Sequence, residues 1–316
     1  VASFCSFQGT SIAQKYLGSR LEILTLTESN LSIKSPIDLI NENWVRSDLD
    51  VPNLGNTSNW KWARLDLDPV IDAGLRVEIA YPTIDSLQVF MVCDGVIKSM
   101  SSAGATIPRS YGDQQLGNYP SFPIPVEDCI KLTCYIRAWS GKQLLLPVRI
   151  EGSRKLLSDG HFRDVFFAIY FGVVISLLIY NLFLYFSVKD SNYLQYVLFI
   201  IAVAGTQLVL NGYDRVFELI STPWLALRLT HIFGILSGVF SILFVRNFLH
   251  LKTKAPIYHK IFGWLYIPYV LALIFLVLGY FNTSYDIING SALSIVLLVP
   301  VSIKVWRSGD ESAAYF

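Results

Sequence analysis

The sequence has few charged side chains, few cysteines and none of the common catalytic motifs. Charged residues make up 16% of its 316 residues, against roughly 25% in ordinary soluble domains. The formal net charge is +1, which gives no electrostatic reason to expect nucleic acid as a partner. The sequence contains no phosphate-binding loop, HExxH zinc motif or GxSxG nucleophile turn. We therefore expect no catalytic residue, no metal site and no cofactor in this chain.

The four cysteines are Cys5, Cys93, Cys129 and Cys134. They form no CxxC pair and lie far from the histidines in sequence, so neither a zinc site nor a redox motif is expected. Cys129 and Cys134 are five residues apart on a predicted strand, or about 16 Å, which is too far for a disulfide. Cys93 and Cys134 are both predicted to face inward. We expect them to be buried free thiols, with a bridge between the two as the alternative.

Long apolar runs account for the shortage of charge. Residues 165–186 and 193–212 contain no charged side chain. Each run has about 20 residues, the length of helix that crosses ~30 Å of hydrocarbon. A core helix of that length would show a polar stripe, and these show none. We predict a transmembrane region at residues 156–316. Its five complete spans are 165–186, 193–212, 224–245, 261–280 and 287–305, and a sixth span starts at residue 313.

The basic residues of the short loops predict the orientation in the membrane. The loop at 246–260 contains four Lys or Arg side chains and no acidic one, whereas the loop at 213–223 contains one basic and two acidic side chains. Loops rich in Lys and Arg lie on the cytoplasmic side. We therefore expect a multi-pass protein of the inner membrane with its amino-terminal domain in the periplasm or outside. Residues 1–13 are typical of the tail of a secretory signal peptide, with a disordered leader as the alternative.

Residues 14–155 have a different pattern, which predicts an exterior β domain. Apolar and polar residues alternate at 75–81 and at 130–137, as in strands with one face in a core. Asp94 and Gly95 follow an apolar run, which is a hairpin signature. Short strands without helical stretches between them predict an all-β jelly roll or sandwich. The fold class is therefore a β-sandwich followed by a helical membrane bundle.

Aromatic side chains are the most informative candidates in this domain. Exposed aromatic faces stack on sugar rings, whereas packing in the core is the alternative for any single tryptophan. The candidates for ligand contact are Trp60, Trp62, Arg109, Tyr111, Tyr119 and Trp139. Trp60 and Trp62 fall on one face of a predicted strand, and the loop at 109–119 is the better placed of the two regions for ligand contact.

Five polar residues near membrane depth are candidates for helix contacts or for coupling: Asn181, Asn211, Asp214, Arg228 and His231. Asn181 and Asn211 are predicted to form hydrogen bonds between helices. Arg228 and His231 are three residues apart and share a helix face. Arg228 either extends to the outer interface while His231 bonds a neighbouring helix, or both contact the outer loop through Asp214. A charge there should face protein or water.

Several segments resemble one family of bacterial membrane proteins. "VPNLGNTSNWKWARLDL" (51–67), "VEIAYPTIDSLQVFM" (77–91), "FPIPV" (122–126) and "LLLPVRI" (144–150) are similar to its exterior sensory domain. "LLIYNLFLYFSVKDSNYLQYVLF" (177–199) and "QLVLNGY" (207–213) are similar to its first two spans. The family is that of the seven-transmembrane receptors with diverse intracellular signalling modules. The resemblance extends over nearly the whole chain from about residue 30.

The resemblance implies a jelly-roll exterior domain, often proposed to bind carbohydrate, followed by seven helices and a cytoplasmic output domain. The sequence ends before the sixth span is complete, so we expect further residues with spans six and seven. A histidine kinase or a diguanylate cyclase is expected after them. Because such modules commonly act as dimers, we also expect a homodimer in the lipid bilayer.

Three classes of function fit the sequence. The first is a sensory receptor that binds a small ligand outside and signals to the cytoplasm. The second is a transporter or channel with an exterior accessory domain, which is disfavoured because Arg228 is the only charged residue within the predicted spans apart from Lys304 at the end of the fifth. The third is a membrane-anchored exterior carbohydrate-active protein, which is disfavoured by the lack of an acid/base pair. We expect the receptor.

Overall fold

A computed structural model describes most of the chain and divides it into two compact units. The sheet unit comprises Gln8–Val165 and Val209–Leu227, and the helical unit includes Phe166–Leu208 and Arg228–Phe316. The residues described are 16–24, 35–39, 42–56, 59–67, 74–107, 116–125, 129–219 and 222–307. We describe each unit separately.

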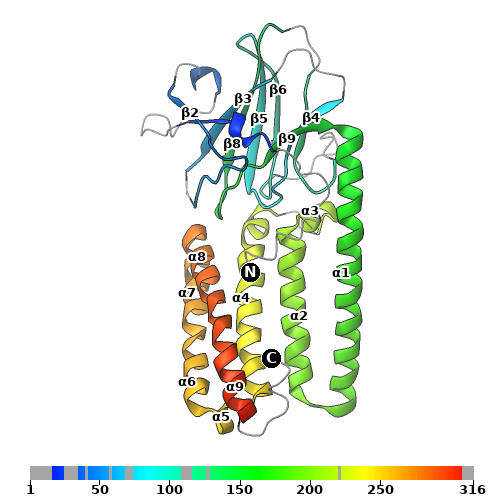
Figure 1. Cartoon of the computed structure of the whole chain (residues 1–316), viewed down its shortest axis with the longest axis vertical. Helices are drawn as coiled ribbons and strands as arrows, with labels where there is room; N and C mark the ends of the chain where they lie inside the picture. Colours follow the sequence, from blue (N-terminus) through cyan, green and yellow to red (C-terminus); the bar gives the residue numbers. More distant parts are fainter. Residues whose placement is uncertain are drawn as a thin grey trace. The chain divides into compact units, whose positions relative to one another are not determined.

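The sheet unit contains an antiparallel sheet of six strands in the order β2-β1-β3-β8-β5-β6 (Figure 1). Its strands are β1 (Glu22–Leu24), β2 (Trp44–Arg46), β3 (Lys61–Leu67), β5 (Ser86–Cys93), β6 (Val96–Ala103) and β8 (Leu132–Trp139). Antiparallel sheets often pack one face on a core. Here the residues that face the core alternate along β8, from Leu132 through Cys134 and Ile136 to Ala138.

A second antiparallel sheet of three strands, in the order β7-β4-β9, packs against the same core. Its strands are β4 (Leu75–Ile79), β7 (Ser121–Pro123) and β9 (Val148–Gly152). Val77, Phe122 and Val148 contribute its buried apolar side chains. The β-sandwich predicted from the alternating pattern is therefore confirmed.

The polar face of β4 differs from the sequence prediction. Residues 75–81 were expected to have one face in water, but Arg76 and Glu78 are both buried. Glu78 pairs with Arg149 of β9, and Arg76 donates a 2.8 Å hydrogen bond to the backbone oxygen of Ser121 in β7. Because β4 is the central strand, its neighbours supply partners that make burial of these polar groups possible.

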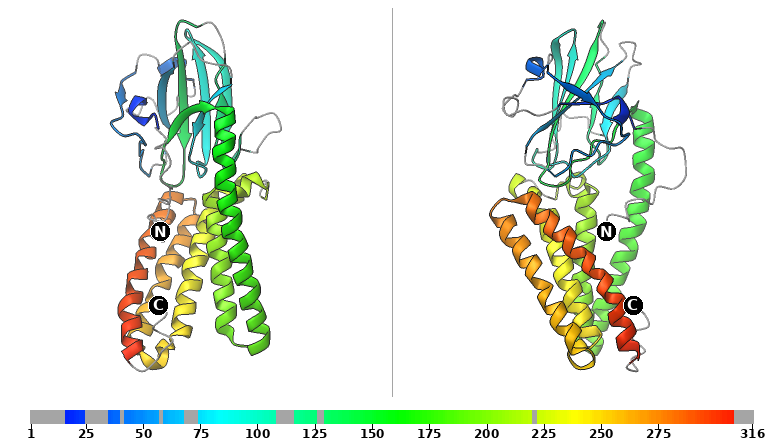
Figure 2. Two further views of the ribbon diagram at one scale, coloured as in Figure 1. Left: turned by 45° about the vertical axis from the view of Figure 1, so that its right-hand side comes forward. Right: turned by 60° about the vertical axis from the view of Figure 1, so that its left-hand side comes forward.

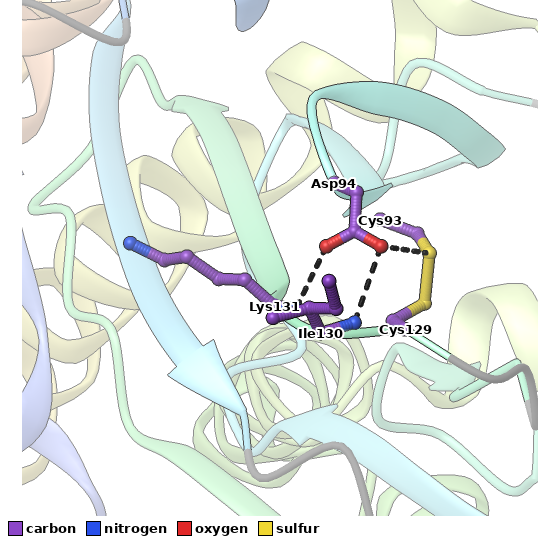
Figure 3. Close-up of a disulfide and its surroundings, with 5 residues drawn as sticks. All are labelled: Cys93, Asp94, Cys129, Ile130 and Lys131. Atoms are coloured by element: carbon purple, nitrogen blue, oxygen red, sulfur yellow. Dashed lines mark hydrogen bonds between the residues drawn. A yellow bond between two sulfur atoms is a disulfide. The ribbon is translucent and has the colours of Figure 1, made fainter.

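The hairpin between β5 and β6 turns at Asp94 and Gly95, as predicted. Both have positive φ, 48° and 82°, which suits the tight turn that joins strands with a right-handed twist. The Asp94 carboxylate accepts hydrogen bonds from the backbone amides of Ile130 and Lys131, at 3.1 and 2.8 Å (Figure 3). The turn is thereby attached to the segment that leads into β8.

The cysteine prediction was partly wrong. Cys93 forms a disulfide with Cys129, across a Cα separation of 5.7 Å (Figure 3). Cys134 is a buried free thiol, as expected. Cys93 is paired with Leu132 in the sheet, so the chain just before β8 passes beside it. The separation of Cys129 and Cys134 along a strand excluded only a bond between those two. The partner of Cys93 depends on how β5 pairs with β8.

Helices make up the rest of the described chain. They are α1 (Ser153–Val188), α2 (Ser191–Leu210), α3 (Tyr213–Val216), α4 (Pro223–Phe248), α5 (Leu251–Lys254), α6 (Pro256–Trp264), α7 (Tyr266–Val277), α8 (Phe281–Ala292) and α9 (Leu298–Arg307), with the 3-10 turn η5 (Leu293–Leu297). Short 3-10 turns η2 (Gly18–Arg20) and η4 (Ile37–Leu39) lie in the sheet unit.

Four helical segments in the described part of the chain are long and apolar enough to cross a membrane: Ser153–Val188, Ser191–Leu210, Pro223–Phe248 and Pro256–Val277. They overlap the first four predicted spans, whose bounds in a membrane stay a prediction. The fifth, 287–305, falls on α8, η5 and α9 and stays a prediction. Pro268 and Pro300 explain the interruptions after α6 and within η5, because proline removes a helical hydrogen bond to the residue four positions earlier.

In the helical unit, α4, α6–α7 and α8–α9 run side by side (Figure 2). Their shared core includes Val245 of α4, Leu276 of α7 and Val301 of α9. Gly238 of α4 lies so close to the ring of Tyr269 that a Cβ would overlap it. Small residues permit this kind of close approach between membrane helices.

Candidate functional site

The face of the six-stranded sheet that points away from the sandwich core carries a cluster of aromatic and polar side chains. Arg137 of β8 lies between Trp62 of β3 and Gln88 of β5 in the sheet register. Its guanidinium carbon is 4.2 Å from the ring centroid of Trp60, and Trp60 lies 6.4 Å from Trp139. We call Trp60, Trp62, Gln88, Arg137 and Trp139 the Arg137 cluster.

The members of this cluster differ in exposure. Trp62 is 1% exposed and its ring stacks on Phe90 at 5.8 Å. It therefore has no free face for a ligand, and its assignment to ligand contact is corrected to core packing. Trp60 and Trp139 are partly exposed. They stay candidates for ligand contact, whereas Arg109 and Tyr111 lie outside the described residues.

The cluster lies at the end of the sheet where β5 begins and β8 ends. Ser86 is paired with Trp139, and the chain before Ser86 and after Trp139 forms two loops that are bonded to each other. The buried Asp85 carboxylate pairs with Lys142 at 2.6 Å and accepts a 2.8 Å hydrogen bond from the Gly141 amide. This clamp fixes the loop after the cluster to the loop before it.

The sheet unit is continuous with the first long helix. Strand β9 ends at Gly152 and α1 begins at Ser153, so no flexible linker separates them. Arg149 of β9 pairs with Glu78 and also with Asp159 of α1, the latter at 3.1 Å. The first turns of α1 are thereby attached to the three-stranded sheet.

A second attachment of α1 uses the loop before β7. Arg163 of α1 donates a hydrogen bond to the side-chain oxygen of Asn118, and its guanidinium lies over the ring of Tyr119 at 3.9 Å. Tyr119 was predicted to contact a ligand. The structure places it beneath Arg163, and its role in ligand contact stays a prediction.

The loop that follows α2 binds the same residues. The Asn118 amide nitrogen donates a 2.7 Å hydrogen bond to the backbone oxygen of Asn211. The Tyr213 hydroxyl donates a 2.7 Å bond to Asp164 of α1. Asn118 therefore bonds both the first helix and the α2–α4 loop. We call Asn118, Tyr119, Arg163, Asp164 and residues 211–213 the junction.

Gly212 occupies the tightest position in the junction. Its φ is +74°, which L side chains rarely adopt. A Cβ there would lie 2.8 Å from the Cβ of Pro82 and 3.2 Å from the backbone oxygen of Asn118. Pro82 is four residues before Ser86 in the chain, so the loop that touches Gly212 leads directly into β5.

Burial perturbs the pKa values of two tyrosines of the junction and of Asp214 next to it. Burial raises the pKa of Asp214 above its ordinary value, while Arg215 opposes this shift. Burial also raises the pKa of Tyr213, as does its hydrogen bond to Asp164. Burial raises the pKa of Tyr119, with Arg163 acting in the opposite direction. At neutral pH both tyrosines are therefore protonated and able to donate.

Two polar residues were predicted to form hydrogen bonds between helices, and for both this stays a prediction. Asn181 donates a 2.8 Å bond to the Leu177 oxygen of its own helix. Asn211 lies past the end of α2, and its backbone oxygen accepts the bond from Asn118. Asparagine often bonds the backbone four residues earlier within a helix.

Arg228 and His231 both contact Phe281 at the start of α8. The Arg228 guanidinium lies 5.1 Å from the Phe281 ring, and His231 Nε2 is 3.1 Å from the Phe281 oxygen. The interpretation in which His231 bonds a neighbouring helix agrees with this contact. The proposed partnership with Asp214 stays a prediction.

Sequence reasoning missed several residues of the junction and the cluster. Asn118, Arg163, Asp164 and Arg137 were not singled out, because they are ordinary surface residues when read along the chain. Only the fold brings residues 45 or more positions apart together, as in the bond of Arg163 to Asn118. Among the described residues no group of three or more His, Cys, Asp or Glu side chains could hold a metal ion.

Two family models match the chain. The model described as 7TM diverse intracellular signalling matches residues 163–316, and the model described as 7TMR-DISM extracellular 2 matches residues 18–151. The first covers the helices from Arg163 of the junction onward, and the second covers the sandwich. No curated protein matches the chain.

Proposed function

Since the chain belongs to the family of seven-transmembrane receptors with diverse intracellular signalling modules, we propose that it senses a carbohydrate outside the cell. The chain is a multi-pass membrane protein with an amino-terminal exterior domain. In this proposal the membrane is the inner membrane, and ligand binding at the Arg137 cluster is reported to a cytoplasmic output domain. The output domain would be a histidine kinase or a diguanylate cyclase, acting as a homodimer.

The observation that carries the proposal is the short covalent path from the Arg137 cluster to the junction. Gln88 of the cluster and Pro82 beside Gly212 are six residues apart on one segment. The buried Asp85–Lys142 pair holds that segment to the end of β8. A ligand that shifts the ends of β5 and β8 would therefore move Pro82 against Gly212.

The junction would pass such a movement to two helices at once. Asn118 bonds Arg163 of α1 and the loop after α2, while Tyr213 of that loop bonds Asp164 of α1. A ligand changes the equilibrium between two arrangements only by its difference in affinity for them. The three bonds supply contacts that can differ between two arrangements.

Binding and transmission can be tested on the chain in lipid nanodiscs. Oligosaccharides, neutral and acidic, are titrated while tryptophan fluorescence is recorded, and Trp60→Ala and Trp139→Ala are compared with Trp224→Ala. Trp224 is 63% exposed and lies on α4, outside the sandwich. We expect the two cluster variants to lose about two- to tenfold in affinity, since stacking on one aromatic ring contributes on the order of 0.5–1.5 kcal/mol. Equal affinity in all three variants would exclude the cluster.

Transmission is measured by hydrogen exchange with and without the best-binding oligosaccharide. We expect ligand to change the protection of amides at 209–219 and at 153–165, because the junction joins these segments to the sandwich. Bound ligand with unchanged exchange in both segments would support binding without coupling through the junction.

A further inference from the structure

Arg137 differs from two other buried cations of the sheet unit, Arg149 and Lys142. Arg149 pairs with Glu78 and Asp159, and Lys142 pairs with Asp85 at 2.6 Å. Arg137 is also buried, at 7% exposure. Among the described residues no carboxylate lies within ion-pair distance of its guanidinium.

The polar atoms of Arg137 are incompletely satisfied within the described structure. Nη1 donates a 3.0 Å hydrogen bond to the side-chain oxygen of Gln88. Nε is buried and has no hydrogen-bond partner in the part of the chain that the structure describes. Burial lowers the pKa of Arg137 below its ordinary value, and a buried charge that has no anion is costly.

Arg64 provides an internal comparison on the same face of the same sheet. Its guanidinium also lies over a tryptophan, at 4.7 Å from the ring of Trp44. Unlike Arg137, it pairs with a carboxylate, that of Glu22 at 2.5 Å. Arg64 therefore has both a tryptophan and a carboxylate beside it, whereas Arg137 has a tryptophan but no carboxylate among the described residues.

Arg137 has no anion beside it among the described residues, and a carboxylate is the anion that best matches a guanidinium. The guanidinium presents N–H donors in a planar fork that matches both oxygens of a carboxylate. The indole ring of Trp60 lies beside the guanidinium, Trp139 lies beside Trp60, and both rings are partly exposed. Flat aromatic faces of this kind stack on the apolar face of a sugar ring.

We propose that the Arg137 cluster is a site for an acidic saccharide, with Arg137 binding the carboxylate of a uronic acid and Trp60 and Trp139 contacting its ring. This inference rests on the proposed function and defines its ligand class. Gln88 is the positioning residue, because its side-chain oxygen orients the guanidinium by accepting from Nη1. Loss of a negative charge from the sugar should therefore reduce binding more than loss of any hydroxyl group.

The test compares one saccharide with and without its charge. Trigalacturonate and its fully methyl-esterified form are titrated against the whole chain in nanodiscs by calorimetry. The ester keeps the rings and removes the negative charges. We expect the acid to bind at least about tenfold more tightly, the low end of the range for hydrogen bonds to charged groups, and the difference to shrink as salt is raised.

Variants then locate the charge preference. Arg137→Met should remove most of the difference between acid and ester, whereas Arg64→Met, the matched control on the same face, should leave it unchanged. Gln88→Leu should lower affinity for the acid while leaving that for the ester within about twofold. Dicarboxylates such as succinate test for a carboxylate site that does not need a sugar ring.

The outcomes separate this inference from the proposed function. Equal binding of acid and ester by the unmodified chain overturns the inference and leaves carbohydrate sensing intact. Binding of succinate as tight as that of the saccharide replaces the sugar by a simple carboxylate ligand. No binding of any neutral or acidic saccharide overturns both. Because the first comparison needs no variant, misfolding of Arg137→Met does not prevent the test.

Discussion

Replacement of Gly212 by alanine should open the junction. Alanine at a φ of +74° costs about 1–2 kcal/mol, because the Cβ meets the following carbonyl oxygen. Its Cβ would also lie 2.8 Å from Pro82, and overpacking of a buried site costs about 1–3 kcal/mol. The sum is about 2–5 kcal/mol. Since 1.4 kcal/mol corresponds to a factor of ten, amide protection in the loop should fall by about 30-fold or more.

Hydrogen exchange followed by mass spectrometry measures this effect. The relevant amides are those of Val216, Phe217 and Leu219, which bond to the backbone oxygens of Gly212, Tyr213 and Asp214. Exchange at 116–122 should also rise, because Asn118 loses its partner on Asn211 when the loop moves. The backbone amides of the β5–β6 hairpin should keep their protection from exchange.

Gly95→Ala is the matched control. Gly95 has a φ of +82°, close to that of Gly212, but nothing lies within 4 Å of a Cβ there. This variant carries the backbone strain without the overlap, and it should leave exchange at 209–219 unchanged. If Gly212→Ala also leaves that segment protected, contact with Pro82 does not hold the loop and the proposed route to the helices is wrong.

Three further predictions concern topology, thiol reactivity and pH. In intact cells an impermeant maleimide should label Leu219→Cys and not Thr253→Cys, because the loop at 246–260 is predicted to be cytoplasmic; the reverse labelling would invert the topology. Burial raises the pKa of Cys134 to about 12, so a small maleimide should modify this thiol only when denaturant unfolds the sandwich, and rapid modification of native protein would contradict its burial. Burial raises the pKa of Asp214, so the protein should lose stability as the pH rises from the ordinary pKa of an aspartate through the raised pKa of Asp214. Asp214→Asn should raise the melting temperature at pH 7, with a gain that shrinks toward pH 4, and a loss at pH 7 would refute this.

Patterns of short range predicted much of this fold. The hairpin at Asp94 and Gly95 depends on neighbouring residues and is confirmed. The alternation along β8 placed Cys134 and Ile136 correctly in the core, but the expected polar face is also buried, because a second apolar cluster that includes Tyr135 packs on it. The first four spans follow from length and composition alone. The break after Trp264 could have been predicted from Pro268, because proline acts on the residue four positions earlier.

Features that depend on register or on distant segments could not be predicted in this way. The bond of Cys93 to Cys129 required knowledge of how β5 pairs with β8. The pairing of buried Glu78 required β9, whose Arg149 lies 71 residues further along the chain. Trp62 and Trp60 are two residues apart, yet one is buried and the other is partly exposed, because only Trp62 has Phe90 beneath it.

The buried Asp85–Lys142 pair is the step at which binding and transmission can be separated. It lies between the Arg137 cluster and Pro82 along the chain. Removing one partner of a buried ion pair typically costs about 3–5 kcal/mol, because the other charge is left without compensation. A variant that replaces both, Asp85→Asn with Lys142→Met, avoids that isolated charge but also removes the clamp. If movement at β5 and β8 reaches the helices through this clamp, the double variant should bind saccharide with unchanged affinity and show no ligand-dependent exchange at 209–219. Retained exchange in the double variant would mean that the sandwich core, rather than the two clamped loops, carries the change to the junction.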